Sequence, residues 1–234
     1  GRGHPPLKTG APVCDVMTGM FGAMGVLAAL QHRNNTGEGQ FVDTSLFESG
    51  IAATFHQSSQ LIATGKAPEA LGNVHPLSGP YEIFEASDGW MTLSAGTDRH
   101  WQRLCAIMGL EGLAADPRFA KTPERMTNLD QVREILAPRF VERTRAEWSV
   151  IFEEAGLPSG PILDTAEMHQ DQQALHRGMI VEVEHSVVGK INTLGPAVKL
   201  SKSPTSVRRA APRLGEHGPE VLSEFGYSHD DIAG

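Results

Sequence analysis

Apolar and polar residues alternate at helical spacing near the start of the chain. The pattern predicts a helix from Val16 to about Arg33, with Gly19, Gly22 and Gly25 along one side. Glycine costs a helix ~1 kcal/mol relative to alanine, so we expect another backbone segment to pack closely there. A second helix is predicted from Ser45 to Thr64. Its expected buried face comprises Leu46, Ile51, Ala52, Phe55 and Leu61.

Strand-like alternation occurs in shorter stretches. Residues 40–44 resemble a short strand that follows a polar, glycine-containing turn at 34–39. Two pairs of alternating stretches flank glycine turns, a pattern typical of hairpins. The expected hairpins join 81–85 to 90–94 around Asp88-Gly89, and 180–184 to 190–194 around Val188-Gly189.

The remaining segments predict a chain of mixed helix and strand. Residues 1–14, rich in proline and glycine, are expected to form a loop, and 98–155 to be mainly helical. The pattern therefore indicates an α/β fold class without internal repeats. The predicted pieces are helices at 101–108, 129–141, 145–155, 166–177 and 219–225 and a short strand at 161–163.

Composition narrows the function classes. The chain has 234 residues, 40% of them hydrophobic, and a net charge of -8. That charge argues against a nucleic-acid partner, because phosphate recognition needs clustered Lys and Arg. The two cysteines, Cys14 and Cys105, form no disulfide framework and favour a reducing, cytoplasmic setting. No histidine spacing suits a helical metal site, so we expect no metal.

Membrane and export signals are not expected. The apolar run from Gly19 to Leu30 is shorter than the ~20 residues that span a bilayer. The first ten residues lack the apolar region of a signal peptide. The chain starts with Gly1-Arg2-Gly3 rather than Met, so we expect it to be an internal piece of a longer polypeptide.

Asp15 is the first residue with candidate chemistry. It lies immediately before the predicted helix, where the residues alone favour a simple N-cap. The same position can also be a site where the helix dipole holds a carboxylate ionised. Ser78-Gly79-Pro80 is either a turn leading into the first hairpin or a loop whose N–H groups approach a ligand. Nucleotide-binding glycine motifs and the GxSxG hydrolase motif are absent from the sequence.

Six sequence blocks, taken in order, resemble the class III CoA-transferase family, also called CaiB/BaiF. The resemblance spans essentially the whole chain and corresponds to the portion of the family from the catalytic aspartate to the C-terminus. The blocks are GAPVCDVMTG (10–19), LAALQHRNNTGEGQFVDTSLFES (27–49), PYEIFEASDGWMTLSAG (80–96), DPRF (116–119), AGLPSGPI (155–162) and APRLGEHGPEVLSEFGYS (211–228).

The resemblance implies an activity. Asp15 would attack the thioester of an acyl-CoA to give a mixed anhydride, then an aspartyl-CoA thioester that an acceptor carboxylic acid captures. Coenzyme A is thus a substrate, and no covalently bound cofactor is implied. Ser78 and Gly79 fall where the family carries a glycine-rich loop that shields the intermediate. His75 and Tyr81 are candidates to line the acyl pocket.

The resemblance also implies an architecture. The family has a Rossmann-like large domain, a smaller α/β domain and two interlocked subunits. Residues 1–64 would belong to the large domain, 65–178 to the small domain, and 179–234 would return to the large one. The family's N-terminal half, which supplies most coenzyme A contacts, is missing here. The expected partner is therefore that half, or a second subunit in a homodimer.

Two alternatives stay open from the sequence. An α-methylacyl-CoA racemase, an isomerase related in fold, would need an Asp/His pair to exchange the α-proton. The VCDVMTG wording around Asp15 favours the transferases instead. The second alternative is a fragment or subunit that is inactive without the missing half.

Overall fold

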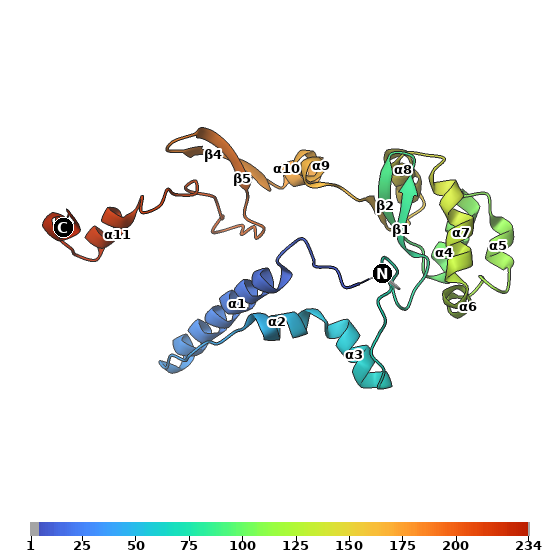
Figure 1. The fold of residues 1–234 in the computed structure, drawn as a ribbon, viewed down its shortest axis with the longest axis horizontal. Helices are drawn as coiled ribbons and strands as arrows, with labels where there is room; N and C mark the ends of the chain where they lie inside the picture. The colour runs from blue at the N-terminus through green and yellow to red at the C-terminus, as the bar shows by residue number, and fades with distance from the viewer. Residues whose placement is uncertain (1–4, 234) are drawn as a thin grey trace. The chain divides into compact units, whose positions relative to one another are not determined.

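The computed structural model describes residues 5–233 and divides into two compact units. The first unit ends at Pro161 and the second begins at Ile162 (Figure 1). Helices and strands occur in both, which confirms the predicted α/β class. The predicted loop at 1–14 lies partly outside the described residues, and 5–12 contain no helix or strand.

The first unit begins with α1 (Val13–Thr36), α2 (Leu46–Ala53) and α3 (Phe55–Thr64). α1 packs against α2, and Figure 1 shows the two side by side. α1 extends beyond the predicted helix at both ends, and it stops at Gly37, whose φ of 81° is left-handed. The predicted single helix from Ser45 to Thr64 is wrong at Thr54. There the N–H and the hydroxyl both donate to the Ile51 carbonyl, at 3.0 and 2.8 Å, which tightens the turn and ends α2.

The segment between α1 and α2 is not the predicted strand, because no neighbouring strand pairs with residues 40–44 in the described chain. It lies instead along the glycines of α1. A Cβ placed on Gly25 would be 2.8 Å from Val42 Cγ1, and one on Gly22 would be 3.8 Å from Thr44 Oγ1. Side chains, not backbone atoms, therefore approach these glycines, closely at Gly25 and at ordinary contact distance at Gly22, so the expected close approach of a backbone is wrong here. At Gly19, no described atom lies within 4 Å of such a Cβ.

The apolar surface of α1, α2 and α3 is open. The expected buried face on α2 and α3 is wrong for this chain, since Phe55 is 71% and Leu61 44% exposed. Among the residues from 5 to 233, α1 is the one helix long and apolar enough to cross a membrane by length and composition alone, with a mean hydropathy of 1.7. A core helix of a soluble protein meets the same criterion. In the described chain, no residue of α1 is buried.

A three-stranded antiparallel sheet and a group of helices make up the rest of the first unit. The sheet has the order β1-β2-β3, and the predicted hairpin is confirmed, with Tyr81 opposite Ser94 and Ala86 opposite Gly89. Its elements are β1 (Tyr81–Ala86), β2 (Gly89–Ser94), β3 (Ser159–Pro161), α4 (Asp98–Ile107), α5 (Glu111–Ala115), α6 (Thr122–Thr127), α7 (Leu129–Phe140) and α8 (Arg145–Glu154).

The core of the unit lies between this sheet and the helices. Alternate residues of the hairpin, such as Phe84 and Met91, point into it, as the period of a strand requires. The Phe84 ring stacks on Phe140 of α7 with a centroid distance of 4.2 Å. Trp148 of α8 donates its indole N–H to the Phe140 carbonyl at 2.8 Å. These contacts give the hairpin a fixed support.

The second unit contains a separate two-stranded sheet. The predicted second hairpin is confirmed, with Val183 opposite Ile191. The predicted helix at 166–177 is divided at Asp171, whose side chain caps the second piece. The domain boundaries after residues 64 and 178 stay predictions. The elements are α9 (Thr165–Gln170), α10 (Gln172–His176), β4 (Ile180–His185), β5 (Gly189–Leu194), α11 (Gly218–Glu224) and α12 (His229–Ala233).

Candidate active site

Asp15 lies in the first turn of α1 and is exposed. The N-cap is Pro12 rather than Asp15, because the Val16 N–H already donates to the Pro12 carbonyl at 3.0 Å. The interpretation of Asp15 as the cap is therefore wrong. Its carboxylate has no side-chain partner among residues 5–233, and no side chain caps the helix. The positive end of a helix dipole lies at this terminus, where it attracts negatively charged groups.

The first turn of α1 is held by its contact with α2. Cys14 Sγ lies 3.3 Å from the position of a Cβ on Gly50, so the absence of a side chain there lets the two helices approach. Thr18 donates its hydroxyl to the Cys14 carbonyl at 2.7 Å. Asp15 is thus presented to solvent from a turn that is braced on one side.

His75 and Tyr81 form a stacked pair at the start of the first hairpin. Their ring centroids are 5.0 Å apart with an interplanar angle of 7°. The backbone N–H of His75 donates to the Tyr81 carbonyl at 2.9 Å. His75 Nδ1 accepts the Leu77 N–H at 3.2 Å. In a neutral imidazole the proton then resides on Nε2, which makes that nitrogen a hydrogen-bond donor.

Gly79 and Pro80 are buried and joined by a cis peptide bond. The Gly79 carbonyl accepts Arg125 Nε at 3.1 Å, and the Pro80 carbonyl accepts the Ala95 N–H at 2.7 Å. Of the two interpretations of Ser78-Gly79-Pro80, this geometry supports a turn anchored beneath the hairpin. Ser78 lies against Gly96, because a Cβ placed on Gly96 would be 1.7 Å from Ser78 Oγ.

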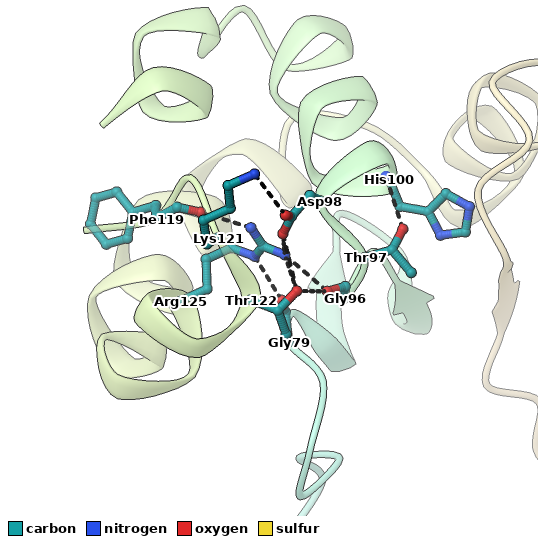
Figure 2. Close-up of polar contacts among 9 residues, drawn as sticks. All are labelled: Gly79, Gly96, Thr97, Asp98, His100, Phe119, Lys121, Thr122 and Arg125. Carbon is teal, nitrogen blue, oxygen red and sulfur yellow. Dashed lines mark hydrogen bonds and ion pairs between the residues drawn. The ribbon is translucent and has the colours of Figure 1, made fainter. Parts of the chain in front are cut away.

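Arg125 of α6 is the centre of a buried polar cluster (Figure 2). Its guanidinium has no exposed surface. Besides Gly79, Nη1 donates to the Phe119 carbonyl at 2.8 Å, and Nη2 to the Gly96 carbonyl at 2.9 Å and to Asp98 Oδ1 at 3.0 Å. Three segments distant in sequence are thereby tied to one side chain.

Asp98 supplies the counter-charge of this cluster. Its carboxylate accepts from Arg125 and from the Thr122 hydroxyl, the latter at 3.1 Å, and Lys121 Nζ lies 3.4 Å away. Burial on its own raises the pKa of Asp98, but these hydrogen bonds and the charge of Arg125 outweigh it, and the pKa is lowered. The cluster therefore keeps Asp98 ionised.

A pocket of about 480 Å³ opens beside β1 and α7. Glu82 in its wall is buried, and its Oε2 accepts Arg133 Nε at 2.6 Å. Glu82 Oε1 has no hydrogen-bond partner among residues 5–233. The lining residues are Leu71, Asn73, Val74, Pro76, Glu82, Ile83, Trp90, Met126, Thr127, Leu129, Asp130 and Arg133.

Metal chemistry has no ready ligand set in the described chain. Within residues 5–233, no group of three or more His, Cys, Asp or Glu side chains is placed to hold an ion. Cys14 is exposed and Cys105 is buried, and both are free thiols. Burial raises the pKa of Cys105 to about 12, so it stays protonated at neutral pH.

The structure thus brings together His75 with Tyr81, and Ser78 and Gly79 with Gly96. No hydrogen bond, ion pair or ring contact joins Asp15 to any of them in the described part of the chain. Arg125 is the residue that sequence reasoning missed. An arginine in a helix is usually solvated, and the sequence alone gives no signal that this one is buried.

Comparison with known proteins identifies the family. The family model of CoA-transferase family III matches residues 1–218. An acyl-CoA transferase of Fusarium pseudograminearum is 35% identical over 234 residues, which are 99% of this chain and 51% of the relative. Human succinyl-CoA:glutarate CoA-transferase is 32% identical, over 97% of this chain and 52% of the relative. The chain therefore spans about half the length of the curated relatives that it matches.

Solved structures share the fold. A CaiB/BaiF family protein from Brucella suis superposes with a TM-score of 0.80 at 29% identity, over 95% of this chain and 57% of the neighbour. A Mycobacterium tuberculosis protein, 22% identical, has a TM-score of 0.79 over 93% of this chain and 59% of its own, and this likeness concerns the fold alone. On the family match and these relatives, the chain belongs to CoA-transferase family III.

Proposed function

We propose that the complete protein transfers coenzyme A between small carboxylic acids, with Asp15 as the nucleophile. The match to CoA-transferase family III over residues 1–218 carries this proposal. Relatives named as acting between succinyl-CoA and glutarate or mesaconate point to dicarboxylic acids as substrates. We therefore take succinyl-CoA as donor and glutarate as acceptor for the first test.

The proposed reaction proceeds by acyl transfer through Asp15. A carboxylate oxygen of Asp15 attacks the donor thioester carbonyl and expels CoA thiolate, which gives a mixed anhydride. The thiolate then attacks the Asp15 carbonyl, which releases the donor acid and leaves an aspartyl-CoA thioester. The acceptor carboxylate attacks this thioester and expels CoA thiolate, which gives a second mixed anhydride between Asp15 and the acceptor. The thiolate then attacks the acceptor carbonyl of that anhydride, which forms the acceptor acyl-CoA and releases the Asp15 carboxylate. Asp15 is regenerated as a carboxylate, and no water is consumed.

The local structure of Asp15 suits this role. A nucleophilic carboxylate must be ionised and accessible, and Asp15 is exposed in the first turn of α1. Unpaired N–H groups of a first helical turn also stabilise an oxyanion that develops beside them. His75, whose Nε2 is a donor, and Tyr81 are proposed to line the acyl pocket with Ser78 and Gly79.

The rest of the architecture follows from the family. We infer that α1 and its neighbours complete a Rossmann-like large domain, and that the sheet and helices around β1 form the small domain. In that arrangement α1 is a core helix rather than a membrane span. The partner is the N-terminal half or a second, interlocked subunit, and a cytoplasmic compartment is proposed.

The test uses the complete protein with succinyl-CoA and glutarate in D₂O. The expected products are glutaryl-CoA and succinate, identified by mass spectrometry, with no deuterium at the α-carbon. Deuterium uptake at the α-carbon without any acceptor acid would instead support the racemase. Loss of succinyl-CoA without formation of the acceptor's own CoA thioester, for every acceptor acid tested, would contradict transfer.

A further inference from the structure

The 77–80 loop (Leu77, Ser78, Gly79 and Pro80) is held from two sides, by Arg125 of α6 and by Ala95, which follows β2. On one side, the buried guanidinium of Arg125 holds the Gly79 carbonyl. On the other, the Ala95 N–H holds the Pro80 carbonyl at 2.7 Å. Figure 2 shows Gly79 and Gly96 converging on the same guanidinium. Lifting the loop would leave buried donors unpaired, which is costly.

Packing adds a second restraint. A Cβ on Gly96 would lie 1.7 Å from Ser78 Oγ, and one on Gly79 would lie 2.7 Å from Leu129 Cδ1. Both glycines are therefore close-contact points rather than hinges. The loop contains a single glycine, so little backbone freedom remains to it. The loop is a fixed part of the unit around β1.

The guanidinium is suited to this task by its geometry. Its planar donors reach carbonyls of three segments at once, at Gly79, Phe119 and Gly96. Asp98 balances the buried charge at 3.0 Å. A lysine ammonium is a point charge with fewer donors and cannot reproduce this arrangement.

We propose that Arg125 is a positioning residue that, together with Gly96, fixes the 77–80 loop as a rigid wall of the acyl site. This inference rests on the proposed function. An aspartyl anhydride or thioester hydrolyses when water reaches it, so a wall that stays in place favours capture by the acceptor acid over capture by water. Arg125 acts through the loop and touches no substrate.

The direct test is the partition of the intermediate in the complete protein. With succinyl-CoA and glutarate, the fraction of thioester lost to water is compared with the fraction recovered as glutaryl-CoA. Arg125→Met is expected to raise the hydrolysed fraction about tenfold, since small misplacements at a reacting site have large effects. Arg139→Met, in the same unit and bonded at the surface to Glu142 at 3.0 Å, is expected to leave it unchanged.

A second variant covers the case in which Arg125→Met does not fold. Gly96→Ala keeps Arg125 but pushes against Ser78, and it is expected to raise the hydrolysed fraction in the same direction. Adding Ser78→Ala removes the hydroxyl oxygen that lies nearest to the new Cβ, without placing a second glycine in the loop, and should restore the partition in part. A folded Arg125→Met or Gly96→Ala that is slower but partitions as the wild type does would overturn the proposal.

Hydrogen exchange in the wild type tests the loop independently of any turnover. The Ala95 amide is expected to exchange as slowly as the amides inside β2, because its partner is the Pro80 carbonyl. Rapid exchange at Ala95 would show that the loop lifts and would also overturn the proposal. Absence of CoA transfer in the wild type would count against the proposed function, whereas the exchange result would stand by itself.

Discussion

Glu82 is buried against Arg133. In this pair the pKa of the carboxyl group is raised, whereas in the Arg125 cluster the pKa of Asp98 is lowered. Its side chain is 3% exposed, while that of Arg133 is 39% exposed. Burial raises the pKa of Glu82 more than the hydrogen bond and the charge of Arg133 lower it. The unpartnered Oε1 is consistent with this imbalance. The carboxylate is thus held in a place that disfavours its charge.

The raised pKa of Glu82 makes the free energy of unfolding depend on pH. Because the folded-state pKa of Glu82 exceeds the unfolded value, the folded protein binds this proton more tightly. The contribution of Glu82 to the free energy of unfolding is therefore greatest below the unfolded pKa. It declines as the pH rises through the folded pKa.

Glu82→Gln tests this account. The amide oxygen still accepts from Arg133 and the buried charge is gone, so we expect an unchanged or higher free energy of unfolding at pH 7. The advantage over the wild type should shrink as the pH falls. Arg133→Met leaves the carboxylate buried alone and should cost about 1–3 kcal/mol. Urea unfolding across the pH range measures the free energy of unfolding of both variants. If Glu82→Gln loses as much stability as Arg133→Met, the buried charge of Glu82 is not unfavourable and this account is wrong.

At the scale of elements, the sequence predicts the features that depend on neighbouring residues and does not predict those that depend on contacts between distant segments. Both hairpins could be predicted because Asp88-Gly89 and Val188-Gly189 encode their turns within a few residues. The alternation at residues 40–44 predicts a strand, but it does not reveal whether a neighbouring strand exists to pair with it. The break at Thr54 depends on its bonds to Ile51, which composition does not indicate.

The same limit applies to the candidate site. Asp15 can be identified from the sequence, because it lies just before the predicted apolar helix and within a family block. Arg125 cannot, because its role depends on the carbonyls of Gly79 and Gly96, which approach it only in the folded chain. Burial of a charged side chain is a tertiary property.

The contact between α1 and the 40–44 segment gives a prediction at this scale. Gly25→Ala gains helix propensity of up to about 1 kcal/mol, but the new Cβ meets Val42 Cγ1 at 2.8 Å. We expect a net loss of about 1–3 kcal/mol in the complete protein. Val42→Ala should relieve this clash. In a double-mutant cycle measured by urea unfolding, the double variant should therefore lose less stability than the sum of the two single variants.

Phe41→Ala is the matched control for that cycle. Phe41 neighbours Val42 in sequence but is 90% exposed. Its combination with Gly25→Ala should be additive within experimental error. If Val42→Ala also proves additive, the close approach between the segment and α1 does not contribute to stability.

At the scale of the whole molecule, the open apolar surface is the main feature. Met24, Phe47 and Ile62 are 62%, 77% and 84% exposed, respectively. Isolated exposed apolar residues are normal, but a surface of this extent over three helices marks an interface. The relatives are about twice as long as the chain. We therefore expect polypeptide outside residues 1–234 to cover these helices.

Expression of residues 1–234 alone tests this expectation. The chain should associate or bind a hydrophobic dye, and it should bind CoA weakly. Co-expression with the N-terminal half should suppress dye binding and restore CoA binding, as followed by light scattering and calorimetry. A stable monomer that binds CoA tightly by itself would contradict the interpretation.

The central claim, that Asp15 carries the covalent intermediate, is tested by trapping with hydroxylamine during turnover of the complete protein. Trypsin cuts after Lys8 and Arg33, and Asp15 is the only carboxylate side chain between them, so the peptide mass locates the label. We expect a hydroxamate on this peptide only when succinyl-CoA is present, and none in Asp15→Asn. Transfer that proceeds with the label elsewhere, or with no label, would contradict the mechanism.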